Sequence, residues 1–249
     1  MNPFFILNWK SYPASQEDIL PLCAALADWR ARVTSGTVVM CPPATLIDDT
    51  QKCVAADERL ASVLIGAQYL DADAKTGGLT PAMLRAANVS AAIIGHSDRR
   101  AQAGETNADV RSAWQQAIAH DILPIVCVGQ PAPDGSFAGL REQVLGAFEG
   151  ASATDVAQCV IAYEPVWAIS TTPGARVEES ADIVRAIQVI REELRGATPK
   201  AILYGGSVTG ASVSNVLSSG AVDGVLVGRA SASPDSLTEL LEALTPFFS

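Results

Sequence analysis

The sequence predicts an α/β protein: a (β/α)8 barrel that forms a single domain over residues 1–249. Three observations predict it: eight short apolar segments, segments of helical character between them, and a length near the roughly 250 residues typical of this barrel. No Pro-, Gly- or Ser-rich linker divides the chain. A doubly wound open sheet is the weaker alternative, and a buried helix can imitate a short apolar strand.

The eight apolar segments are continuous rather than alternating, as expected for strands buried on both faces. They are FFIL (4–7), TVVMC (37–41), VLIGA (63–67), AAIIG (91–95), ILPIVCV (122–128), CVIAY (159–163), AILYG (201–205) and VDGVLVG (222–228). Parallel strands need crossover connections, which are usually helices.

Helical character is clearest in residues 15–31, 105–120 and 177–194. In the last range, apolar residues recur at a spacing of three to four, which predicts one stripe that packs on the sheet. The stripe contains Val177, Ala181, Val184, Ile187, and Ile190 or Leu194.

The chain is acidic, with 17 basic and 27 acidic residues and a formal net charge of -10. It has no basic cluster that could follow a phosphate backbone, so we expect no nucleic-acid partner. An anionic substrate would need a site built from local donors, such as helix N-termini and a well-placed lysine.

Five cysteines, at positions 23, 41, 53, 127 and 159, show no CxxC spacing. This pattern predicts neither a disulfide framework nor a zinc site, and it favours the reducing cytoplasm. No apolar run approaches the roughly 18 residues of a membrane span, and the N-terminus lacks the features of a signal peptide. We therefore expect a cytoplasmic protein without a membrane segment.

Polar residues follow several of the predicted strands, where barrels carry their catalytic groups. Asn8 and Lys10 follow the first strand, His96 the fourth and Glu164 the sixth. Each residue type alone is more often structural than catalytic. A carboxylate base, a neutral imidazole and an ammonium together suit proton abstraction next to a carbonyl, with His96 and Lys10 holding the enediolate.

Glycine-rich turns follow the seventh and eighth strands, at GGS (205–207) and GR (228–229). Barrels often bind phosphate at these turns through backbone N–H groups. The combination predicts an aldose–ketose isomerase for a phosphorylated sugar, which needs no metal and no organic cofactor.

Seven segments resemble the triosephosphate isomerase family, in the family's order and over the whole chain. They are NWK (8–10), GAQ (66–68), IIGHSDRR (93–100), CVG (127–129), YEPVWAI (163–169), YGGSVTGA (204–211) and DGVLVG (223–228). The resemblance implies a TIM barrel and a cytoplasmic homodimer. The implied reaction is the glycolytic and gluconeogenic interconversion of D-glyceraldehyde 3-phosphate and dihydroxyacetone phosphate.

The resemblance also implies catalytic roles. Glu164 moves the proton, His96 polarises the carbonyl as a neutral imidazole, Lys10 supplies positive charge and Asn8 donates a hydrogen bond. We expect Ser97 to cap a helix beside His96, whose partial positive charge favours the neutral ring. Phosphate is then expected on backbone N–H groups of four residues: Ser170, Ser207, Gly228 and Arg229.

The same resemblance makes the segment after Glu164 a lid that closes over the phosphate and excludes water. Its first hinge is Pro165, Val166 and Trp167, although Trp167 could instead be only a core anchor. Tyr204 and Ser207 are expected to latch the closed lid.

The lid tip departs from the family, since Ser170 to Gly174 replaces Gly-Thr-Gly-Lys-Thr. Pro173 fixes φ and removes an N–H, so we expect a stiffer tip with Gly174 as the second hinge. Gly78 stands where the family has a glutamate near the lysine, which predicts that Lys10 lacks a carboxylate partner.

Two further departures concern assembly and phosphate binding. Loop 68–78 is about three residues shorter than usual, with Tyr69 in place of a common asparagine, so we expect a homodimer that is weakened or altered. Arg229 replaces a glycine, and its guanidinium either strengthens phosphate binding or points to solvent. Two alternatives stay open: an isomerase for another sugar phosphate, such as a tetrulose phosphate, and an inactive phosphate-binding paralogue.

Overall fold

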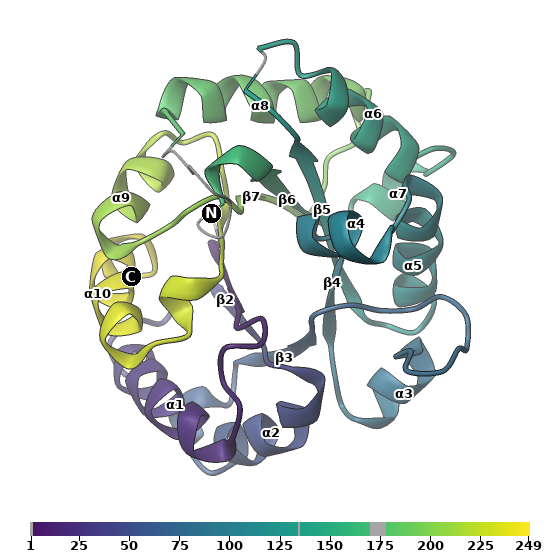
Figure 1. Cartoon of the computed structure of the whole chain (residues 1–249). Coiled ribbons are helices and arrows are strands. Elements are labelled where there is room, and N and C mark those ends of the chain that lie inside the picture. Colours follow the sequence, from purple (N-terminus) through teal and green to yellow (C-terminus); the bar gives the residue numbers. More distant parts are fainter. Residues whose placement is uncertain (1, 134, 170–177) are drawn as a thin grey trace.

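The protein folds as one closed barrel of eight parallel strands. A computed structural model describes residues 2–133, 135–169 and 178–249. Each strand pairs with the next in chain order, and the eighth pairs with the first. Helices surround the strands, as Figure 1 shows. The predicted (β/α)8 barrel is confirmed, and the open-sheet alternative is wrong.

The strands match the eight apolar segments to within two residues at either end. They are β1 (Phe4–Asn8), β2 (Thr37–Cys41), β3 (Leu64–Ala67), β4 (Ala91–Ile94), β5 (Leu123–Gln130), β6 (Val160–Pro165), β7 (Ala201–Tyr204) and β8 (Gly224–Val227). Continuous apolar runs thus became strands because both of their faces are buried, one against the barrel interior and one against the helices.

The described helices include the three that the sequence predicted most clearly, α1 (Gln16–Arg30), α5 (Asn107–Ala119) and α8 (Ser180–Glu193). The others are α2 (Ile47–Ala55), α3 (Pro81–Ala86), α4 (Ser97–Ala103), α6 (Ala138–Ala147), α7 (Ala153–Val156), α9 (Gly210–Ser218) and α10 (Pro234–Leu244). Short 3-10 turns, η3 (Val166–Ala168) and η4 (Arg229–Ser231), follow β6 and β8.

The buried face of α8 differs in part from the predicted stripe. Val184 is 41% exposed and Ala181 is also exposed, while Val177 lies outside the described residues. The buried stripe starts at Ile183 and continues through Ile187, as well as Ile190 and Leu194. The helix begins only at Ser180, and the residues that pack on the barrel at three-to-four spacing start at Ile183 rather than at Val184, so the predicted stripe is wrong in its first turn.

Buried side chains form two layers, one inside the barrel and one between barrel and helices. In β6, Val160 and Ala162 belong to the inner layer, whereas Ile161 and Tyr163 belong to the outer layer. Since strand side chains alternate in direction, Glu164 points to the inside at the end of β6. The strand pattern therefore aims the carboxylate at the mouth of the barrel.

Within the described residues, no helix combines the length and the apolar character that crossing a membrane requires.

Candidate active site

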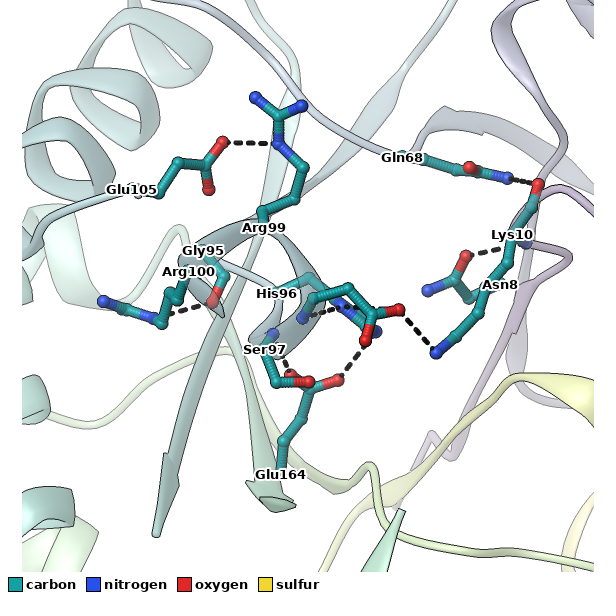
Figure 2. Close-up of polar contacts among 11 residues, drawn as sticks. Asn8, Lys10, Gln68, Gly95, His96, Ser97, Arg99, Arg100, Glu105 and Glu164 are labelled. Atoms are coloured by element: carbon teal, nitrogen blue, oxygen red, sulfur yellow. Dashed lines mark hydrogen bonds and ion pairs between the residues drawn. The ribbon is translucent and has the colours of Figure 1, made fainter. Parts of the chain in front are cut away.

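The ends of the strands surround a cavity of about 180 Å³. The cavity brings together residues from β1, β4, β6, β7 and β8, which confirms that the predicted groups share one face of the barrel. Its lining includes Asn8, Lys10, His96, Glu164, Ile169, the segment 205–209, and Gly228, Arg229 and Ala230. Figure 2 shows Asn8 and Lys10 from the end of β1 converging with His96 after β4 and Glu164 on β6.

His96 carries its proton on Nε2. Its Nδ1 accepts a hydrogen bond of 3.0 Å from the backbone N–H of Asp98, so this nitrogen is unprotonated in that arrangement. His96 is also the N-cap of α4, and Ser97 is already the first helical residue. The expectation that Ser97 caps the helix is wrong, because the imidazole itself satisfies the free N–H of Asp98.

Glu164 is buried and faces His96. Its Oε1 lies 3.2 Å from Nε2 of His96, and its Oε2 accepts a hydrogen bond of 2.8 Å from the backbone N–H of Ser97. Glu164 is 2% exposed, so its carboxylate depends on these few partners. Glu164, the imidazole of His96 and the start of α4 thus form one contact chain (Figure 2).

The backbone holds Lys10 in an unusual conformation. Lys10 has φ of +48°, a left-handed value that is uncommon for a non-glycine residue. Two neighbours fix it: Oδ1 of Asn8 accepts from the Lys10 N–H at 3.1 Å, and the Gln68 amide donates to the Lys10 carbonyl at 2.6 Å. Strain that its neighbours maintain in this way is typical of a functional position.

The ammonium of Lys10 has a carboxylate partner. Its Nζ lies 2.8 Å from Oδ2 of Asp98, so the prediction that Gly78 leaves Lys10 without a carboxylate is wrong. Burial opposes the charge of Asp98, but the hydrogen bond from Lys10, the ammonium charge and the nearby His96 ring outweigh it and lower the pKa of Asp98. The ion pair therefore comes from α4 and not from loop 68–78.

Loop 68–78 folds back on itself. The Tyr69 hydroxyl donates to the Gly77 carbonyl at 3.1 Å, and Asp71 accepts from the backbone N–H of Leu79 at 2.9 Å. A Cβ at Gly78 would lie 2.9 Å from Oδ2 of Asp71, closer than Cβ contacts normally come. The compact loop thus explains the glycine, since a glutamate there would displace Asp71.

The predicted phosphate donors differ in whether their backbone N–H groups already have a hydrogen-bond partner. The Ser207 N–H donates to the Ala168 carbonyl at 3.0 Å, so this donor is occupied in the structure. No hydrogen bond from the backbone N–H of Gly228 or Arg229 to another described residue is present. Arg229 is exposed beside the cavity, and its guanidinium lies 5.7 Å from the ring centre of Tyr12. This side chain therefore lies at the cavity mouth.

Part of the predicted lid is described. Pro165 ends β6, while Val166 and Trp167 form the half-buried start of η3. Ser170 and Gly174 lie outside the described residues. The Tyr204 hydroxyl interacts with Glu178, a buried residue just before α8.

Sequence reasoning missed Asp98 and Glu178. Asp98 had a signal, because it follows His96 by two residues and opens a helix beside Lys10's strand end. No signal in the sequence pointed to Glu178, because nothing in the residues before α8 links it to Tyr163 and Tyr204, which lie on two different strands. Only the folded barrel brings these three side chains together.

Comparison with known proteins agrees with the geometry. The sequence model of the family described as Triosephosphate isomerase matches residues 3–244. The chain is 34% identical to the triosephosphate isomerase of Roseiflexus castenholzii, covering 98% of both chains. It is also 34% identical to that of Alkaliphilus oremlandii, covering 92% of this chain and 94% of the relative.

A solved structure is similar as well. The crystal structure of triosephosphate isomerase from Bartonella henselae matches with a TM-score of 0.79 and 28% identity, over 98% of this chain and 99% of the other. Together with the family match over nearly the whole length, these findings show that the chain belongs to the triosephosphate isomerase family.

Proposed function

We propose that this chain interconverts D-glyceraldehyde 3-phosphate and dihydroxyacetone phosphate by proton transfer through an enediolate. The observation that carries the proposal is the contact of Glu164 with His96, at 3.2 Å, on a cavity that Lys10 also lines. The two sugars are isomers, so the reaction relocates protons and an electron pair within one molecule. This is the work of an intramolecular oxidoreductase.

Glu164 acts as the base. Its carboxylate removes a proton from the carbon next to the carbonyl and returns a proton to the neighbouring carbon, while the electron pair stays on the substrate as an enediolate. In the structure Oε2 accepts from Ser97, so one carboxylate oxygen must turn from α4 toward the substrate. The short glutamate side chain can do this by rotation about its own bonds.

His96 and Lys10 stabilise the enediolate. The Nε2–H of His96 donates to the substrate oxygen on which negative charge develops, and its orientation is fixed because Nδ1 is bound to Asp98. The ammonium of Lys10 adds positive charge, and Asp98 holds it in position. Asn8, which is buried and lines the cavity, donates a further hydrogen bond through its amide.

The phosphate of the substrate binds on the opposite side of the cavity. The backbone N–H groups of Gly228 and Arg229 support this placement, because they start η4 beside the cavity without a described partner. Ser207 contributes its N–H after release from Ala168, and Ser170 contributes from outside the described residues. Unpaired N–H groups at the start of a helical turn suit a phosphate.

The segment after β6 is proposed as a lid. Pro165, Val166 and Trp167 form its first hinge, and Gly174 forms the second. Tyr204 latches the lid: its hydroxyl interacts with Glu178, and the hydroxyl oxygen can at the same time accept a hydrogen bond from a backbone N–H of the lid. A closed lid excludes water from the reacting enediolate.

We further propose a cytoplasmic homodimer that serves glycolysis and gluconeogenesis. The five cysteines are free thiols, and four of them are buried, which suits a reducing compartment. The compact loop 68–78 supports a dimer that is weaker than usual, because Tyr69 and Asp71 are bonded to the backbone of Gly77 and Leu79 in the same chain.

The test is a direct assay of the purified chain with glyceraldehyde 3-phosphate and, separately, with a tetrulose phosphate. We expect turnover of the triose phosphate in both directions and a kcat/KM for it that exceeds the tetrulose value. A preference for the four-carbon sugar would replace this proposal by the related isomerase. An inert wild type that still binds a phosphoglycolate-like anion would identify an inactive paralogue.

A further inference from the structure

A buried carboxylate outside the cavity lies close to two tyrosines. Glu178 is 5% exposed and precedes α8. Its Oε1 accepts a hydrogen bond of 2.9 Å from the Tyr163 hydroxyl, and the hydroxyl of Tyr204 interacts with the same carboxylate. No ion pair between Glu178 and a cation of the described residues is present.

The two tyrosines lie side by side on adjacent strands of the barrel. Tyr163 on β6 and Tyr204 on β7 are register partners, and their ring centres lie 6.2 Å apart. Both side chains belong to the outer layer of the core, whereas the cavity lies at the inner mouth of the barrel. Glu178 therefore bridges two strands from behind the site.

Each tyrosine is connected to a different part of the cavity. Tyr163 directly precedes Glu164, and its carbonyl accepts from the Gly205 N–H at 2.8 Å. A Cβ at Gly206 would lie 2.2 Å from the Tyr204 hydroxyl, so this hydroxyl lies directly against the turn 205–207. A Cβ at Gly205 would come within 3.0 Å of Glu164 Cγ. Glu164 and the turn 205–207 therefore pack on each other, and Tyr163 and Tyr204 support both of them.

No cation of the described residues pairs with this buried carboxylate, and burying an unpaired carboxylate is unfavourable, which argues for a role. Burial is the main cause that raises the pKa of Glu178 to about 7, Asp182 of α8 adds to it, and the hydroxyls of Tyr163 and Tyr204 oppose it. Helix α9 borders the site with Ser212, Asn215 and Val216, none of which is charged. Asp182 is itself paired with Arg185.

We propose that Glu178 is a positioning residue for the isomerisation: its ionised carboxylate holds Tyr163 and Tyr204 together and so fixes Glu164 relative to the turn 205–207. The inference rests on the proposed function. An ionised carboxylate can accept from both hydroxyls, whereas a protonated one must use one oxygen as a donor. Protonation loosens the support, so turnover falls as the pH drops through the region near 7.

The test compares Glu178→Gln with Glu179→Gln, the same substitution at the adjacent, exposed position. The variables are kcat and KM for glyceraldehyde 3-phosphate between about pH 5.5 and 9. We expect Glu178→Gln to lower kcat about tenfold at pH 8, within the range that a small misplacement of a catalytic group causes. The decline of kcat as the pH falls through about 7 should be absent in Glu178→Gln. Glu179→Gln should keep the wild-type kcat at pH 8 and the wild-type decline at lower pH.

Two further measurements separate positioning from loss of the fold. Tyr163→Phe should lower kcat less than Glu178→Gln does, and it should not lower kcat further in the Glu178→Gln background. Infrared titration should show a buried carboxyl that ionises near pH 7 and is missing in Glu178→Gln. A Glu178→Gln enzyme with the wild-type kcat and the wild-type dependence of kcat on pH would overturn the inference while leaving the isomerase activity established. An inactive wild type would instead overturn the function on which it rests.

Discussion

Lys10 and Asp98 form an ion pair at the cavity, with Nζ 2.8 Å from Oδ2. The backbone N–H of the same aspartate binds Nδ1 of His96. One residue at the start of α4 therefore orients the ammonium through its side chain and the imidazole through its main chain. Replacement of its side chain tests the first contact without touching the second.

Asp98→Asn should lower kcat about tenfold or more, because the ammonium of Lys10 loses the charge that holds it in position. Lys10→Ala should abolish turnover, and combining the two changes should add nothing further. Steady-state kinetics with Asp73→Asn, an exposed position with the same change of charge, is the control. If Asp98→Asn turns over like Asp73→Asn, the ion pair does not position Lys10.

Glu164→Gln should lower kcat about 1,000-fold, since an amide cannot accept the proton and general-base catalysis contributes roughly 10²- to 10⁴-fold. The amide oxygen of the new glutamine can still accept from the Ser97 N–H, and the predicted phosphate donors are unchanged, so the affinity for inorganic phosphate should stay close to the wild-type value. Rates are followed in a coupled assay and phosphate affinity by calorimetry. A loss below about tenfold would rule out Glu164 as the base.

Arg229→Gln should raise KM and reduce the dependence of kcat/KM on salt concentration. The guanidinium lies at the cavity mouth of a chain with a net charge of -10, and no carboxylate of the described residues pairs with it. Local positive charge attracts a dianion and is screened by salt. Arg85→Gln removes the same charge from the exposed side of α3 and should leave both quantities unchanged. Equal behaviour of the two variants would mean that Arg229 only points to solvent.

The proposed homodimer should dissociate at higher concentrations than a dimer with a longer loop, because Tyr69 and Asp71 are already bonded to the backbone of Gly77 and Leu79. Sedimentation across a dilution series from about 10 μM to about 10 nM measures this, since dimer stability depends on protomer concentration. We expect a dimer at micromolar concentration. A monomer there would contradict the proposed assembly.

Glu178 should make the stability of the protein depend on pH. Its pKa is raised in the folded state to about 7 from an ordinary 4.5, so its contribution is fully present below pH 4.5 and is lost as the pH rises through 7. The loss amounts to about 3 kcal/mol at the 1.4 kcal/mol of one pKa unit. Urea unfolding should therefore find Glu178→Gln more stable than wild type at pH 8, although it is less active.

At pH 5 this difference should largely vanish, because the wild-type carboxyl is then protonated. Glu179→Gln should follow the wild type throughout, as its side chain is exposed. A Glu178→Gln protein that is equally destabilised at both pH values would mean that the carboxylate serves the fold alone.

The strands and the main reactive groups could be predicted from the sequence. Eight continuous apolar runs define the barrel, because strands with two buried faces need apolar residues at every position. The order of strands then places Asn8, Lys10, His96 and Glu164 at one mouth, since all parallel strands end on the same side. The apolar pattern and the strand order are therefore enough to predict that these four residues lie at the same end of the barrel.

What the sequence could not give is the set of contacts between elements that are distant in the chain. The partner of Lys10 is 88 residues away, and the tyrosines that share Glu178 lie on separate strands. Packing on the barrel likewise decides the first turn of α8, where Ile183 is buried and Val184 is exposed. The barrel and the residues at its mouth are predictable, because periodicity and strand order are local properties. The partners that hold those side chains are not predictable in this way, because packing across the barrel selects them.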